Sequence, residues 1–305
     1  DGPPYNAGSA DVLGQLEIKE DGIHRLQLSD QFGGTRNDPR NEYRLVVRKA
    51  APDFALVSWA LHMELRNGDR NAVSKPLALR GGATMALEVV AIRRDGFEGE
   101  IELFMEGLPE GITAQGLKIP SGQSRGMMLV TADPNAPRSF GNVTFSGRAN
   151  IDGETVTRPC RLASMAWPIP DAWSDLPSPR LLADVPISVS GFDFAPLTIA
   201  PTTRDAYTVT AGEKLTIPLV QTRRSEFSGA AMKCRTMGAG FEGVPMFDVA
   251  LTADSSEVIL DTATLKTQPG EYVIAFYGGA VAKYRHRPKD VDVAEEARRK
   301  AEEEV

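Results

Sequence analysis

The stretch "RGGATMALEVVAIRRDGFEG" (residues 80–99) overlays "TAGEKLTIPLVQTRRSEFSG" (residues 210–229) without a gap. The offset between the two is constant at 130 residues, as from Arg93 to Arg223, and both copies carry a paired arginine followed by a phenylalanine and a glycine. Each copy also alternates apolar and polar residues, which is typical of a strand with one buried face. The sequence therefore predicts a duplicated β-sandwich module.

The same alternation recurs along most of the chain, and turn-forming residues separate the runs at short intervals. The predicted strands lie at residues 22–30, 42–48, 85–92, 100–107, 126–132, 141–151, 214–222, 247–253, 256–262 and 271–279. The predicted fold class is all-β. It consists of tandem β-sandwich domains, namely a jelly-roll-like fragment plus two immunoglobulin-like sandwiches, with a short C-terminal α-helix.

The text "EDGIHRLQLSDQFGG" (20–34), followed by "DPRNEYRLVVR" (38–48), resembles the end of the bacterial pre-peptidase C-terminal domain. That family closes with a "DG-x-Y-R-L-x-V-x-D" strand, a loop rich in Gly, Asp and Asn, and a final "Y-R-L-x-V" strand; here His24 stands at an aromatic position. The resemblance implies a small exported β-sandwich whose earlier strands are expected before Asp1. It carries over no catalytic residue. Some members bind calcium through loop carboxylates, which makes Asp30 and Asp38 calcium candidates, although a plain turn is the favoured interpretation.

The combination of this N-terminal segment with the immunoglobulin-like modules resembles large exported proteins of planctomycete-type bacteria. It implies an extracellular, periplasmic or cell-envelope location. The expected organisation has five segments: a truncated pre-peptidase-type sandwich (1–49), a first repeat (50–159), a connector or extension rich in Pro and Trp (160–192), a second repeat (193–285) and a charged helix opening a coiled coil (286–305).

The charge, the apolar runs and the cysteine content argue against several kinds of partner and site. A net charge of −7 and an isoelectric point near 5.2 argue against a nucleic-acid partner, because no basic surface would release counterions. The apolar runs are too short for a transmembrane segment. Cys160 and Cys234 stand far apart without a metal-binding or redox motif, and two separate buried thiols are favoured over one bridge.

Residues with catalytic potential are few. The chain has three histidines, and it carries no G-x-S-x-G, H-E-x-x-H or G-x-G-x-x-G motif. His24 is expected on the apolar face of its strand. Glu98, Glu100, Glu102 and Glu106 alternate along a predicted strand, so a solvated face is favoured over a pair of sugar-cleaving acids. The sequence thus predicts no enzyme and no cofactor.

Two groups of residues remain as candidate binding sites. The pairs Arg93–Arg94 and Arg223–Arg224 suit a carboxylate or sulfate chemically, but a role in shaping the corner after the strand is favoured. Gly99 and Gly229 are expected to supply the backbone angles that the next strand needs. Trp167 and Trp173 are interpreted as a structural wedge, with a sugar-binding platform as the alternative.

The last nineteen residues predict a helix with Asp292 as N-cap, supported by the pairs Glu295–Arg299 and Glu296–Lys300 four residues apart. Taken together, the sequence predicts a non-catalytic structural or adhesive protein of the cell envelope. Its partner would be a protein or cell-surface polymer, or another copy of itself. The alternatives are an accessory region of a secreted hydrolase and a carbohydrate-binding module.

Overall fold

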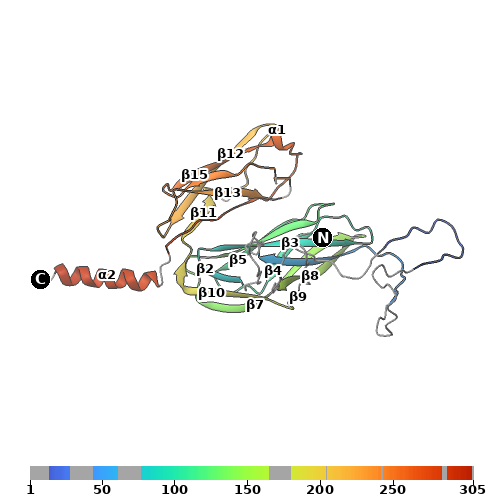
Figure 1. Cartoon of the computed structure of the whole chain (residues 1–305), viewed down its shortest axis with the longest axis horizontal. Coiled ribbons are helices and arrows are strands. Elements are labelled where there is room, and N and C mark those ends of the chain that lie inside the picture. The colour runs from blue at the N-terminus through green and yellow to red at the C-terminus, as the bar shows by residue number, and fades with distance from the viewer. Residues whose placement is uncertain are drawn as a thin grey trace, which may run out of the picture.

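A computed structural model describes residues 14–27, 44–60, 77–164, 180–203, 205–238, 240–241, 243–283 and 287–303. Strands make up 50% and helices 8% of the structure, so the prediction of an all-β sandwich class with a short C-terminal helix is confirmed. Figure 1 shows two β modules joined side by side, with the C-terminal helix extending away from them.

One sheet of the first module has the strand order β1-β3-β6-β5, and all its strands are antiparallel to their neighbours. These strands are β1 (Asp53–Ala60), β3 (Thr84–Arg94), β6 (Arg125–Ala132) and β5 (Ile112–Leu117). The alternation read from the sequence decides which face is buried. Leu87 and Val89 of β3 are 0% exposed, and they pack in the core of this module.

The facing layer contains β4 (Glu102–Glu106), β7 (Ser139–Ile151) and β8 (Glu154–Ser164), with the short β9 (Arg180–Leu181) beside β8. β8 changes partners half-way. It pairs antiparallel with β7 as far as Pro159, and from Cys160 it pairs parallel with β1. Proline has no N–H for a continued ladder, so the change occurs where the first ladder ends. β8 thereby links the two layers.

Two further strands complete the first module. β10 (Val185–Phe194) pairs antiparallel with β7 and parallel with β2 (Leu77–Gly81). Val185, Ile187 and Val189 of β10 are buried in the first core. The sequence placed a connector over 160–192 and the second repeat from residue 193, so that expected boundary falls inside β10. Pro186 and the nearby Ser and Gly residues are typical of turns, so the sequence did not predict β10, whose partner strands are distant in sequence.

The second module is a sandwich of two three-stranded sheets, ordered β11-β12-β15 and β14-β13-β16. Their bounds are β11 (Leu197–Pro201), β12 (Lys214–Arg223), β13 (Ala231–Met237), β14 (Phe247–Ala250), β15 (Ser255–Asp261) and β16 (Ala275–Gly278). A four-residue helix, α1 (Thr262–Leu265), follows β15 and is capped by Asp261, which accepts a hydrogen bond from the Thr264 N–H at 3.0 Å.

The duplicated stretch forms the same strand pair in both modules. Thr84 of β3 lies opposite Thr131 of β6, and Lys214 of β12 lies opposite Asp261 of β15. Both members of the second pair are shifted by 130 residues from the first, so the register is the same. Gly82 and Gly212, which precede these strands, have positive φ values of 74° and 94°, as expected for turn glycines.

The two modules are in direct contact. Only Ala195 and Pro196 separate β10 from β11. Met127 on the outer face of β6 is 5% exposed, because residues of the second module cover it. It packs with Ala86 and Leu129 of the first module and with Met237, Ala275 and Tyr277 of the second. We call this group the Met127 cluster.

The N-terminal residues differ from the prediction. Strands were expected at 22–30 and 42–48, yet residues 22–27 and 44–48, the described parts of these ranges, form no strand and are exposed. His24 is therefore exposed rather than packed on an apolar face, and its ring nitrogen lies 3.2 Å from the Glu20 carbonyl oxygen. An alternating run forms a stable strand only when a partner strand is available to it.

The C-terminal helix α2 (Pro288–Glu303) begins with proline at its first position, where the missing N–H costs nothing. Its described side chains are exposed, and the expected Glu296–Lys300 ion pair is present at 3.0 Å. Among the described residues, no helix is long and apolar enough to cross a membrane.

Candidate functional site

Arg93 lies at the end of β3 and binds the backbone of its own module. Its guanidinium donates hydrogen bonds to three carbonyl oxygens, those of Gln123 (2.9 Å), Gly99 (2.7 Å) and Pro120 (2.9 Å). The guanidinium carbon also lies 5.1 Å from the centre of the Phe97 ring. Burial lowers the pKa of Arg93, and nearby Glu98 partly offsets this effect. Arg93 thus fastens the loops that surround the strand end.

The equivalent Arg223 plays a similar part in the second module. It donates to the Leu251 carbonyl at 3.2 Å and to the Asp254 carboxylate at 2.6 Å. Its neighbour Arg224 instead binds at the junction between modules, where it donates to the Ala195 carbonyl at 3.1 Å and to the Thr198 hydroxyl at 2.8 Å. That hydroxyl in turn donates to the Gly82 carbonyl of the first module at 2.8 Å.

The candidate arginines therefore do not meet in one binding site. Arg93, Arg223 and Arg224 hold separate backbone segments, whereas the side chain of Arg94 is exposed. These contacts agree with the favoured corner-shaping interpretation.

The structure gives a different reason for the glycine that follows Phe97. Gly99 does not have a positive φ; a Cβ at this position would lie 2.8 Å from the Phe97 ring. Phe97 is 5% exposed and stacks on Phe54, with 5.4 Å between ring centres. The need for glycine at 99 thus comes from close packing. Gly229 also lacks a positive φ, so the expected backbone role is wrong for both residues.

The acidic side chains around β4 are matched with bases. Arg148 binds the Glu102 carboxylate through two nitrogens, at 2.8 and 2.9 Å, and this hydrogen bonding lowers the pKa of Glu102. Lys118 pairs with Glu100 at 2.9 Å. Glu98 and Glu106 are exposed. The solvated face that the sequence predicted is present for Glu102 and Glu106 of β4, whereas Glu98 and Glu100 precede the strand, and the ion pairs were not predicted.

Cys160 and Cys234 are separate buried thiols, as favoured from the sequence. Cys160 belongs to the core of the first module and Cys234 to that of the second. Burial raises the pKa of Cys160 to about 12 and that of Cys234 to about 11. Neither thiol forms a reactive thiolate near neutral pH.

A cationic and aromatic surface at the end of β10 was missed by the sequence analysis. Phe192, 44% exposed, contacts the guanidinium groups of Arg138 and Arg287, which are 5.7 and 4.9 Å from its ring centre. Lys289 lies 5.3 Å from the ring of Phe194. These contacts attach the start of α2 to β10. The signal in the sequence was the pair of phenylalanines in "GFDF", which the expected domain boundary had divided.

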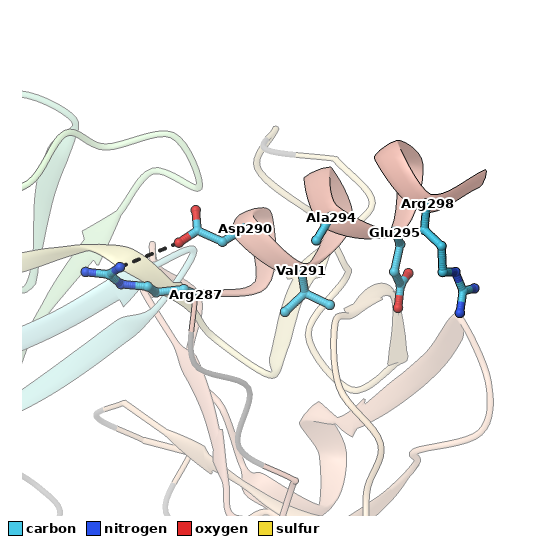
Figure 2. Close-up of a pocket in the computed structure, with 6 residues that line it drawn as sticks. All are labelled: Arg287, Asp290, Val291, Ala294, Glu295 and Arg298. Atoms are coloured by element: carbon cyan, nitrogen blue, oxygen red, sulfur yellow. Dashed lines mark ion pairs between the residues drawn. The ribbon is translucent and has the colours of Figure 1, made fainter. Parts of the chain in front are cut away.

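Beyond this attachment, one face of α2 borders an open hollow. Figure 2 shows Val291 and Ala294 on this face between charged residues at both ends. Arg287 and Asp290 form an ion pair of 3.7 Å at the start of the helix. The lining comes from residues 287–298 alone, so the hollow is a helix face rather than an enclosed site.

Trp167, Trp173, Asp30 and Asp38 lie outside the described residues. Within the residues that are described, no group of three or more His, Cys, Asp or Glu side chains could hold a metal ion. No family model matches this chain, and no curated protein matches it.

Proposed function

We propose that this chain is a non-catalytic structural or adhesive protein of the bacterial cell envelope, in which the two modules act as a rigid unit. The observation that carries the proposal is the contact between the modules. The Met127 cluster buries apolar side chains from both modules, and Arg224, Thr198 and Gly82 add a hydrogen-bonded connection beside the two-residue linker. Such a contact suits a spacer that holds surfaces at a fixed separation.

We further propose that both modules are immunoglobulin-like. In support, the layers β1-β3-β6-β5 and β4-β7-β8 have the strand arrangement ABED and CFG of the constant-type immunoglobulin sandwich. The second module has the corresponding pair β12–β15 in the same register. Domains of this architecture serve many unrelated functions, so the architecture supports the structural role without naming a ligand.

The extracellular or periplasmic location and the pre-peptidase-type N-terminal segment are part of the same proposal. Their support is the sequence resemblance of residues 20–48. The partner would be another protein or a cell-surface polymer. An accessory region of a secreted hydrolase would use the same rigid modules to position a catalytic domain.

Small-angle X-ray scattering of the dilute full chain tests the rigid-unit proposal. We expect one narrow distribution of interatomic distances, consistent with the packed arrangement in Figure 1. Met127→Asp should broaden that distribution, because a charge would be buried in the Met127 cluster. The control Phe140→Asp changes a residue that is 72% exposed and should leave the distribution unchanged. If the unaltered chain itself requires many module orientations to fit the scattering, the spacer role is wrong.

A further inference from the structure

β16 has an open edge. It pairs with β13 on one side, where Cys234 lies opposite Gly278 and Thr236 opposite Phe276, and the sheet order β14-β13-β16 ends there. In the first module, β7 pairs with β4 as β16 pairs with β13, but β7 is also covered by β8 on its other edge. Among the described strands, no counterpart of β8 covers β16.

The core side chains beside this open edge are more exposed than the corresponding side chains of the first module. Val143 and Phe145 of β7 point into the first core and are only 3% and 2% exposed. Ile274 and Phe276, which face the second core at β16, are only partly buried. Partly exposed apolar side chains beside an unpaired strand edge are the expected result when a sandwich lacks one strand.

The chain also contains a strand-like segment without a partner. Residues 44–47 (Arg-Leu-Val-Val) are exposed, and they form no strand pairing. Leu45, Val46 and Val47 are 51%, 68% and 84% exposed. Alternation would place Leu45 and Val47 on one face of a strand.

The place where this segment leaves the first module is held by Asp95. Its carboxylate pairs with Arg48 and accepts a hydrogen bond from the Ala51 N–H at 3.0 Å. Figure 1 shows the N-terminal trace at the end of the first module, on the side away from the second module. Within one chain, residues 44–47 are not paired with β16.

We infer that residues 44–47 of one copy add as a strand to the β16 edge of a second copy, with Leu45 and Val47 covering its half-open core. Addition of an extended segment to a free sheet edge gains backbone hydrogen bonds and side-chain burial together. Because donor and acceptor are different surfaces of the chain, the contact is head-to-tail, and repeated contacts link copies into a ring or an open chain. This inference rests on the proposed structural role and gives that role a partner.

Light scattering coupled to size-exclusion chromatography, over a wide range of concentrations, tests the inference. The mean mass of the unaltered chain should rise with concentration. Val47→Asp should shift this rise to concentrations at least tenfold higher, because a carboxylate would face the core of the acceptor. The control Ile23→Asp makes the same change at a residue that is 95% exposed outside the donor segment, and it should behave like the unaltered chain. A monomer at every concentration, or an equal loss in both variants, overturns the inference.

Disulfide trapping gives an independent readout of strand pairing. Gly279 directly follows β16, and a Cβ there meets open space, so Gly279→Cys should fold normally. Chains with this change are mixed with chains carrying one cysteine at 44, 45, 46 or 47, while Cys160 and Cys234 stay buried and unreactive. Cross-linking between copies should alternate along the four positions, since neighbouring strand side chains point to opposite faces. An even or absent pattern refutes strand addition.

A monomer that keeps the narrow distance distribution in X-ray scattering would overturn this inference alone and leave the structural role standing.

Discussion

Arg93→Ala should lower the free energy of unfolding of the first module by about 3 kcal/mol. The change removes three hydrogen bonds from a charged donor, and each such bond contributes roughly 1.5–3 kcal/mol when it is fully formed. The side chain is only partly buried and water can replace part of the loss, so the expected total is below the roughly 4.5–9 kcal/mol that three fully formed bonds would contribute. The loss of the contact with Phe97 acts in the same direction.

The repeat and the adjacent arginine supply matched controls. Arg223→Ala should cost only about 1 kcal/mol, because Arg223 binds one carbonyl, at 3.2 Å, and an exposed carboxylate. Arg94→Ala changes an exposed neighbour and should stay within about 0.5 kcal/mol of the unaltered chain. Arg93→Lys should recover little, because a single ammonium group cannot reach three carbonyls in the fork geometry of a guanidinium.

Urea unfolding followed by circular dichroism measures these differences, and hydrogen exchange of peptides from β3 and β12 assigns each transition to a module. The expected order of destabilisation is Arg93→Ala, then Arg223→Ala, then Arg94→Ala. If Arg93→Ala and Arg94→Ala are equally stable, the paired arginine does not shape the corner. Ligand binding would then be the better explanation of the paired arginine.

Further tests concern turns and thiols. Gly82→Ala should destabilise the chain more than Gly212→Ala in thermal unfolding. Both glycines have positive φ, but a Cβ at 82 would also lie 3.2 Å from Arg224, whereas one at 212 meets open space. Equal effects of the two changes would refute the close packing at Gly82. Cys160 and Cys234 should react with a thiol reagent in urea but hardly at all in the folded chain at pH 8; fast native labelling would contradict their burial. Burial raises the pKa of Cys160 to about 12, so above about pH 9 the unfolded chain releases a proton that the folded chain keeps, and the free energy of unfolding falls as pH rises. Cys160→Ala should reduce this decline by up to about 1.4 kcal/mol per pH unit, and an unchanged slope in urea titrations would show that the thiol ionises normally.

The parts of the fold that follow from local pattern could be predicted. The strands predicted at 85–92 and 214–222 lie within β3 and β12, and the structure adds that they pair with β6 and β15 in the same register. Alternation and a glycine before each strand were sufficient, because both are properties of neighbouring residues.

The parts that depend on distant partners could not be predicted. β10 joins β2 and β7 across long stretches of chain, and residues 22–27 and 44–48 pair with no strand of their own chain among the described residues. The module interface was missed for the same reason, although "GMMLV" held a clue. Met127 and Met128 point to opposite faces of β6, yet both are buried, which requires a second layer outside the sandwich.

The joint at Ala195 and Pro196 has a consequence for any longer array of such modules. Both carbonyls of this dipeptide are bound by Arg224, one through its side chain and one through its backbone N–H at 2.8 Å. The proline ring fixes one torsion and restricts the residue before it. Modules repeated on this joint would therefore wind into a superhelix of constant pitch, and inserting a single residue at the joint would alter that pitch.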